Sequence, residues 1–101
     1  MNYRDHLLVI LMEESAEVTQ TCSKALRFGF KDGYPGSGTT NLDDLRTELS
    51  QLMAVVNMLE EDLTSDYSDE DSALYDTHDA KRKKEKVNKY LERSRANGRL
   101  S

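Results

Sequence analysis

The chain has 101 residues, of which 37% are hydrophobic and 33% are charged, and its formal net charge is −5. A domain of this size buries only about 60–70% of the surface that its unfolded chain exposes. We therefore expect one marginally stable domain that forms a homo-oligomer, either a dimer or a tetramer. The single cysteine, Cys22, excludes an internal disulfide and a cysteine-rich zinc site. It lies among apolar residues, so we expect it to be buried as a small hydrophobe.

The sequence does not predict a membrane protein or a secreted protein. No apolar run approaches the ~20 residues that a membrane-spanning helix needs. The N-terminus also lacks the basic, apolar and small-residue pattern of a secretory signal. We expect a cytoplasmic protein without a membrane partner.

Charge is distributed unevenly along the second half of the chain. Residues 60–79 carry nine acids and no Lys or Arg, whereas residues 81–101 carry nine Lys or Arg against Glu85 and Glu92. A basic tail can indicate nucleic-acid binding. However, the acidic block can neutralise it within the fold or across a subunit contact. We do not expect nucleic acid to be the main partner, and we keep a nucleic-acid-associated helical module as an alternative.

The first predicted helix spans about residues 3–28. Asn2 is a candidate N-cap, with Asp5 placed to complete a capping box. Gly29 lies where a helix C-cap is expected. Residues 31–38 are rich in glycine and predict a loop. Apolar residues recur at helical spacing along one face of this helix: Leu7, Leu8, Leu11, Val18, Cys22, Ala25 and Leu26.

The second predicted helix spans about residues 41–64, with Asn41 as its candidate N-cap and Asp44 as its third residue. An acidic connector follows over about 65–76, with a short helix near residues 72–75. A basic C-terminal helix over about 77–97 has few apolar anchors. No run alternates like a strand. The predicted fold class is all-α, a single domain over 1–101 built from a helical hairpin and a weaker third helix.

Two acids interrupt the apolar faces of the hairpin. At 100° per residue, Glu14 falls inside the apolar arc of the first helix, and Glu17 falls at its edge. Glu48 and Gln51 hold the same two positions on the second helix. Both helices therefore carry one carboxylate toward the expected contact and a second oxygen donor one turn later.

A carboxylate in an apolar contact costs several kcal/mol unless a raised pKa, a basic partner or a bound cation compensates it. Residues three apart on a helix are neighbours, so the two pairs could converge on one or two ions. All four side chains are oxygen donors, which favours Mg²⁺ or Mn²⁺ over zinc. Ordinary solvated charge is the alternative for either pair alone.

The combination of Glu14-x-x-Glu17 and Glu48-x-x-Gln51 resembles the Glu-x-x-Glu, Glu-x-x-Asp signature of MazG-like all-α NTP pyrophosphohydrolases. Residues 13–18 and 24–29 are similar to short stand-alone MazG-like proteins found in phage genomes, and the resemblance covers about residues 7–63. It implies a four-helix-bundle type fold completed by oligomerisation. It also implies location in the host cytoplasm if the chain is phage-encoded.

The resemblance implies conversion of (d)NTP to (d)NMP and pyrophosphate, in control of the nucleotide pool. It implies that Glu14, Glu17 and Glu48 are catalytic metal ligands and that Gln51 occupies the fourth ligand position. Gln51 departs from the Asp of the family, and a neutral amide should lower metal affinity and cannot serve as a base. Asp44, one turn before Glu48, and Glu13, beside Glu14, are candidates for the missing charge.

Lys24 and Arg27 close the first predicted helix beside the glycine-rich loop. They could bind the substrate phosphates, or they could simply complement the negative end of the helix. Residues 81–84 could likewise close over a triphosphate or form a solvated helix face. The runner-up to an enzyme is a catalytically weakened relative that binds a nucleotide or a partner through the same helices.

Overall fold

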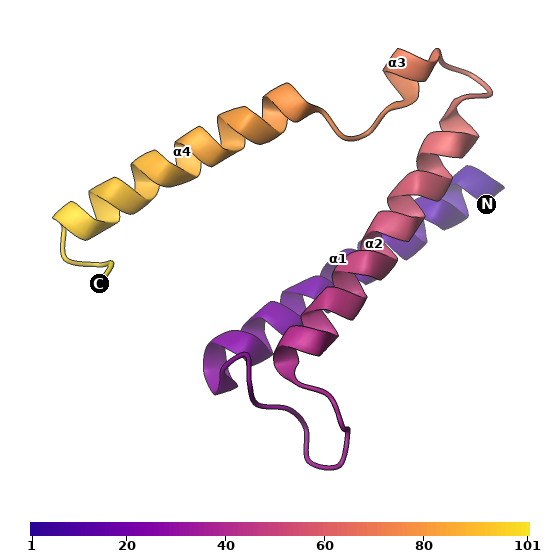
Figure 1. The fold of residues 1–101 in the computed structure, drawn as a ribbon. Coiled ribbons are helices and arrows are strands. Elements are labelled where there is room, and N and C mark those ends of the chain that lie inside the picture. Colours follow the sequence, from indigo (N-terminus) through magenta and orange to yellow (C-terminus); the bar gives the residue numbers. More distant parts are fainter.

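Two long antiparallel helices, α1 and α2, form a hairpin from which the rest of the chain projects (Figure 1). The computed structural model describes residues 1–101, which form four helices and no strand, so the all-α prediction is confirmed. The helices are α1 (Tyr3–Phe28), α2 (Asn41–Leu63), the short α3 (Asp69–Ser72) and α4 (Thr77–Ala96). None of them is long and apolar enough to cross a membrane.

The start and end of α1 follow the sequence signals. The Asn2 side chain accepts a hydrogen bond from the backbone N–H of Asp5, and the Asp5 carboxylate accepts one from the backbone N–H of Asn2. Gly29 ends the helix with φ of 91°, a left-handed value that glycine adopts without steric cost. The predicted capping box and C-cap are therefore confirmed.

The start of α2 differs from the prediction by one residue. Its N-cap is Thr40, which forms a capping box with Asp43, rather than Asn41 with Asp44. Both Thr40 and Asn41 carry a capping oxygen, and each has an acid three residues later. Asn41 is instead only 5% exposed and donates its side-chain amide to the Gly29 carbonyl at 2.8 Å. It therefore joins the two helices, while Thr40 caps.

The contact between α1 and α2 follows a seven-residue spacing. Leu7 and Thr21 are buried on α1, and Asn41 and Val55 are buried on α2. Glu14 lies midway between the first two and Glu48 midway between the second two. An antiparallel register that sets the two glutamates opposite each other also sets Leu7 opposite Val55 and Thr21 opposite Asn41. Such a heptad stripe is typical of paired helices.

The predicted contact face was wrong at one edge. Cys22 is exposed, and Leu26 is 89% exposed, although both were expected to be buried. The contact is centred on the direction of Glu14, so Cys22 and Leu26 lie beyond its border. With Leu42, Leu49 and Met53 they belong to a second apolar surface of the hairpin, which is open in the single chain. We call this surface the open apolar side.

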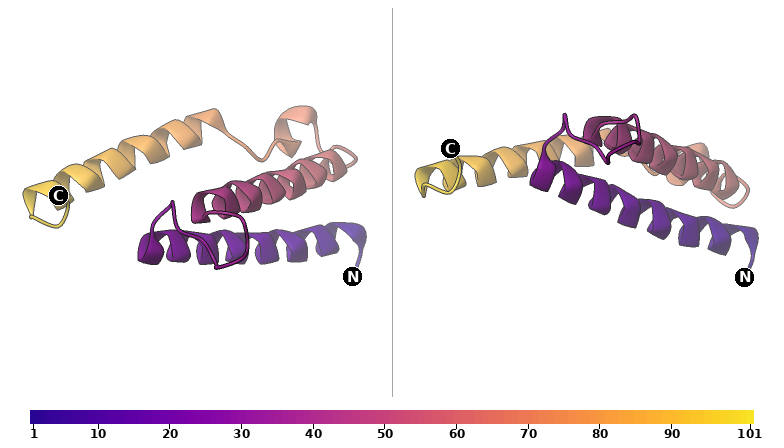
Figure 2. Two further views of the ribbon diagram at one scale, coloured as in Figure 1. Left: turned by 60° about the horizontal axis from the view of Figure 1, so that its bottom comes forward. Right: turned by 90° about the horizontal axis from the view of Figure 1, so that it is seen from below.

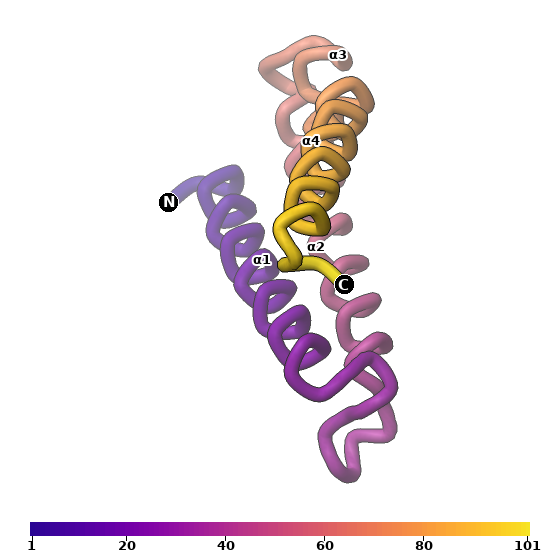
Figure 3. Tube along the Cα trace, turned by 90° about the vertical axis from the view of Figure 1, so that its left-hand side faces the viewer, coloured from indigo at the N-terminus to yellow at the C-terminus, as the bar shows by residue number.

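The arm α4 packs against no other helix. It follows α2 through α3 and extended connectors, and it projects away from the hairpin in Figures 1 and 2, whereas in Figure 3 its C-terminal end points toward the viewer. The radius of gyration is 17.5 Å, against about 13 Å for a compact domain of this length. The chain by itself therefore forms a hairpin with an arm and does not close into a bundle.

The connector before α4 is tied to α2. The predicted short helix near residues 72–75 lies slightly earlier, as α3, and Ser68 caps it. The backbone N–H of Leu74 then donates to the Glu60 carboxylate at 2.9 Å. Helix α4 begins after the Asp76 N-cap and ends at Ala96, so both ends agree with the predicted range of 77–97 within one residue.

Candidate functional site

Two carboxylate oxygens at the middle of the hairpin lack hydrogen-bond partners. They are Oε2 of Glu14 on α1 and Oε2 of Glu48 on α2, and both atoms are buried. Buried polar atoms in proteins are almost always hydrogen-bonded, because leaving one unpaired forfeits its hydration. The prediction that these two acids face the helix contact is therefore confirmed, and no hydrogen bond offsets the burial of these two oxygens.

The electrostatics of Glu48 show how closely the acids gather. Burial raises the pKa of Glu48 above its usual value. The charge of Glu17, a hydrogen bond shared with Glu17 and the charges of Glu14 and Asp44 raise that pKa further. Proximity of like charges disfavours the ionised form. The structure therefore brings three other predicted acids, Glu14, Glu17 and Asp44, close to Glu48.

No basic side chain balances this cluster. The ion pairs of the chain lie elsewhere: Arg4 bonds to Asp62 and Asp66, Arg46 to Asp43, and Arg82 to Asp79. Of the three remedies for buried carboxylates, the structure shows a raised pKa and no Arg or Lys partner. A cation remains as the third.

The acidic side chains do not form a preorganised metal-coordination site. No group of three or more His, Cys, Asp or Glu side chains is arranged to hold a metal ion. Glu17 is exposed beside the two half-buried acids, and Asp44 accepts a hydrogen bond from the Thr39 hydroxyl at 2.9 Å. A shared ion would require these side chains to turn toward it.

Two predicted residues stand apart from the cluster. Gln51 and Glu13 are exposed, and neither contributes to the raised pKa of Glu48. Glu13 directly precedes Glu14, and one residue turns a helix by about 100°, so Glu13 points away from the contact with α2. Of the two candidates for the missing fourth charge, Asp44 is the one that the structure brings near Glu48.

Lys24 and Arg27 line a cavity of ≈ 290 Å³ at the loop end of the hairpin. Asp44 lines the same cavity, so it connects the acidic cluster with the basic residues. Neither Lys24 nor Arg27 forms an ion pair with an acid, although the Arg27 guanidinium lies 5.0 Å from the centre of the Phe28 ring. Both charges are available to a ligand.

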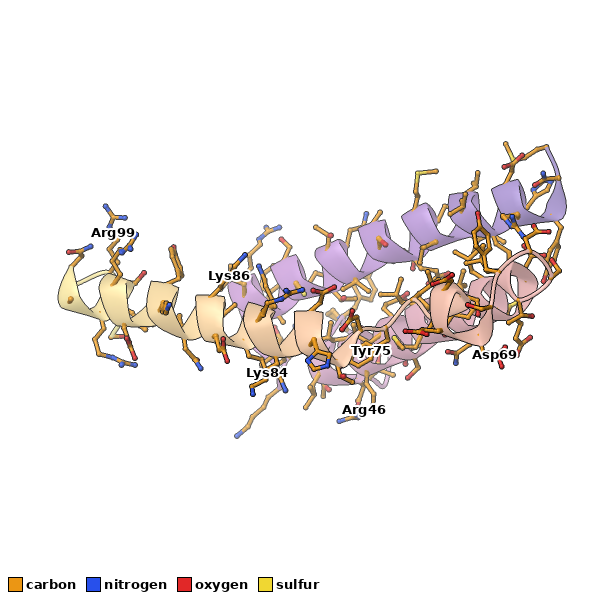
Figure 4. The ribbon with its side chains drawn as sticks, turned by 90° about the horizontal axis from the view of Figure 1, so that it is seen from above. Arg46, Asp69, Tyr75, Lys84, Lys86 and Arg99 are labelled. Atoms are coloured by element: carbon orange, nitrogen blue, oxygen red, sulfur yellow. The ribbon has the colours of Figure 1, made fainter.

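The basic arm does not cover the cluster. Residues 81–84 lie on α4, which has no contact with α1 or α2. Lys84 and Lys86 leave α4 on different sides, and Arg99, which follows α4 in the chain, lies beside its last turns (Figure 4). The positive charge of the arm is therefore spread around its axis rather than gathered over the hairpin.

Sequence reasoning missed the other walls of the loop-end cavity. They include Phe28 at the end of α1 and Asp32, Tyr34 and Pro35 in the loop. The loop was recognised from its glycines, but nothing in its sequence indicated that it folds back against the start of α2. The paired aromatic and acidic residues within it were the available signal.

The chain was compared with protein-family models, with curated proteins and with solved structures, and no match was found in any of the three.

Proposed function

We propose that this protein is a metal-dependent nucleoside triphosphate pyrophosphohydrolase that converts (d)NTP to (d)NMP and pyrophosphate, and that its chemistry lies at the Glu14/Glu48 cluster. The observation that carries the proposal is the pair of buried carboxylate oxygens without hydrogen-bond partners. Enzymes place acids at such a cost where function requires them. The resemblance of Glu14-x-x-Glu17 and Glu48-x-x-Gln51 to the MazG-like signature supports the reaction class.

The donor set fits a hard divalent cation. Glu14 and Glu48 offer buried oxygens, and Glu17 lies next to them at the protein surface. Carboxylate oxygens without a nearby His or Cys suit Mg²⁺, and Mn²⁺ as a substitute. When bound, such an ion supplies neutralisation of phosphate charge and activation of water.

The remaining residues have distinct roles in this proposal. Asp44 supplies a further negative charge to the cluster from one turn along α2, in place of the aspartate that Gln51 replaces. Gln51 contributes a neutral oxygen at most. Lys24 attracts the substrate phosphates toward the cluster, and Arg27 adds a second positive charge that binds the substrate at the loop end.

The same proposal includes a homo-oligomer, a dimer or tetramer in which copies of the hairpin complete a helical bundle. The chain exposes 8201 Å², whereas a compact protein of its mass exposes about 5,800 Å². A standard stable interface buries about 1,600 Å² in total, counted over both partners. The excess on one chain is therefore ample for such a contact. The open apolar side, which includes Leu26, Leu42 and Leu49, is the surface that a second hairpin would cover.

The test is a pyrophosphate-release screen over the common NTPs and dNTPs with Mg²⁺ or Mn²⁺. We expect Glu14→Gln and Glu48→Gln to lower the rate by about a hundredfold or more, because each removes a charged ligand of the ion. Glu61→Gln is the matched control, since Glu61 is exposed on α2 outside the cluster. It should keep the wild-type rate. Equal rates in all three variants would sink the proposal.

Metal binding can be measured without turnover. An ion that binds only the folded state at 100 times its Kd adds about 2.7 kcal/mol to stability. Mg²⁺ should therefore raise the thermal midpoint of the wild type and of Glu61→Gln, but not of Glu48→Gln. Stabilisation of all three alike would place the ion elsewhere.

A second candidate is a catalytically weakened relative that binds a nucleotide without hydrolysing it, and the exposed, neutral Gln51 favours it. Nucleotide binding without pyrophosphate release across the whole screen would identify this case. If the loss of turnover comes from weak metal binding, Gln51→Asp should restore turnover.

A nucleic-acid-associated module is a further alternative, favoured by the uncovered basic arm α4. It would show salt-sensitive DNA binding, because binding by Lys and Arg releases counterions.

A further inference from the structure

The loop-end cavity lies between the last turn of α1, the 29–40 loop and the first turn of α2. Its volume of ≈ 290 Å³ is close to the lower end of small-molecule sites, which run from about 300 to 1,000 Å³. That size suits one ring system with its attached sugar rather than a large ligand.

The loop wall of the cavity is fixed in place by the start of α2. The backbone N–H of Asn41 donates to the Asp32 carbonyl at 2.6 Å, and that of Leu42 donates to the Phe30 carbonyl at 3.1 Å. Gly33 packs so closely on Thr39 that an added Cβ would lie 2.0 Å from the Thr39 carbonyl oxygen. The residues that flank Gly33 are therefore held at defined positions.

The chemistry of the walls is balanced rather than simply basic. Lys24 and Arg27 bring two positive charges, while Asp32 and Asp44 bring two negative charges. A site for phosphate alone would not place two carboxylates beside its cations. The rings of Phe28 and Tyr34 add flat apolar surface, and Tyr34 is 81% exposed and free to stack. Flat surface with both donors and acceptors matches a nucleobase.

The position of the cavity matches the proposed reaction site. Asp44 lines the cavity and stands one turn from Glu48, about 6 Å along the axis of α2. Lys24 follows Glu17 by seven residues, about 10 Å along α1. A nucleotide with its base in the cavity can therefore extend its phosphates past Lys24 toward Glu14 and Glu48.

We propose that the loop-end cavity is the nucleoside pocket, in which a nucleobase stacks on Tyr34 and meets Arg27 and Asp32 at its polar edge. The proposal rests on the proposed function for its choice of ligand. It assigns base selection to the loop and phosphate chemistry to the middle of the hairpin. Substrate preference then changes with the loop while Glu14 and Glu48 stay the same.

The test measures binding of the common nucleoside monophosphates to the full-length protein by calorimetry, with ribose 5-phosphate as the probe that lacks a base. The wild type should bind at least one monophosphate more tightly than ribose 5-phosphate. Tyr34→Ala should weaken that binding by about tenfold, since loss of one stacked base contact costs about 1–3 kcal/mol. Tyr34→Phe keeps the ring and should bind as the wild type does.

Tyr75→Ala is the matched control, because Tyr75 is an exposed tyrosine in the connector before α4. It should leave the affinity unchanged. Gly33→Ala gives an independent variant, since the added methyl group displaces the loop wall, and it should also weaken binding. Circular dichroism of each variant checks that the helices remain.

Failure of the pocket and failure of the proposed function give different results. Unchanged monophosphate binding in Tyr34→Ala, or equal wild-type affinity for ribose 5-phosphate, overturns the pocket even if the protein releases pyrophosphate. Loss of base-dependent binding in Tyr34→Ala supports the pocket even if the protein hydrolyses no triphosphate.

Discussion

The hairpin and the arm are both long regular helices, yet they are stabilised in different ways. Helices α1 and α2 bury a heptad stripe against each other and hold the acidic cluster between them. Helix α4 has no partner, and its residues are nearly all exposed. Its helix depends on an N-cap at Asp76, a basic last turn and residues of high helix propensity. A regular helix therefore does not by itself show that a segment contributes to the core or to the candidate site.

The largest contrast between the two regions should come from a matched pair of leucines. Leu59 on α2 is 5% exposed, whereas Leu91 on α4 is 36% exposed. Leu59→Ala should lower the free energy of unfolding by about 2–3 kcal/mol, because it leaves a cavity in a very small core. Leu91→Ala should change it by less than about 0.5 kcal/mol. Urea titration followed by circular dichroism measures both, and a larger loss for Leu91→Ala would reverse the comparison.

A pH effect should be confined to the hairpin. The pKa of Glu48 is raised in the folded state above its ordinary value of 4.5. The folded protein therefore holds this proton more tightly than the unfolded chain does, and stability falls as pH rises from that value through the folded pKa. Unfolding of the metal-free protein in EDTA from about pH 4 to pH 8 measures the slope.

Glu48→Gln should flatten this slope, because its amide does not titrate, while Glu61→Gln should keep it. An equally steep slope in Glu48→Gln would assign the effect to other carboxylates. If the cluster binds Mg²⁺ as proposed, saturating Mg²⁺ should reverse the wild-type slope, since the ion requires the ionised carboxylates.

The smallest change in the stability of the hairpin is expected from a substitution that breaks helix α4. Lys86→Pro costs about 3 kcal/mol in a helix interior and should remove much of the helical signal of α4. The hairpin should still unfold at the same urea concentration, because α4 does not contact it. A lower midpoint would mean that the arm stabilises the hairpin, within the chain or across an oligomer.

Local sequence signals predicted most of the fold. Caps and helical periodicity gave the bounds of α1 and α4 within one residue, and those of α2 within one residue at its end. These features depend on neighbours in the sequence. The N-cap of α2 was misassigned because Thr40 and Asn41 carry equivalent local signals, and only the contact of Asn41 with Gly29 distinguishes them.

Features that depend on where the two helices touch were harder to predict. The positions of Glu14 and Glu48 were confirmed, because each is in line with the buried residues seven positions before and after it. Cys22 and Leu26 were misplaced, because an apolar arc wider than one contact does not show which part faces the partner helix. The loop-end cavity was missed, because the acidic and aromatic residues of the loop were its only sequence signal and their place beside α2 depends on backbone hydrogen bonds between the loop and α2.

One consequence follows from the way the hairpin is fastened at both ends. At the open end, the Arg4 guanidinium bonds to Asp62 at 2.7 Å and Asp66 at 2.8 Å, and at the other end Asn41 bonds to Gly29. The like charges midway between them cannot relax by letting the helices part. The repulsion between Glu14 and Glu48 is therefore retained in the middle of the hairpin. A bound cation would relieve this repulsion without changing the contacts at either end.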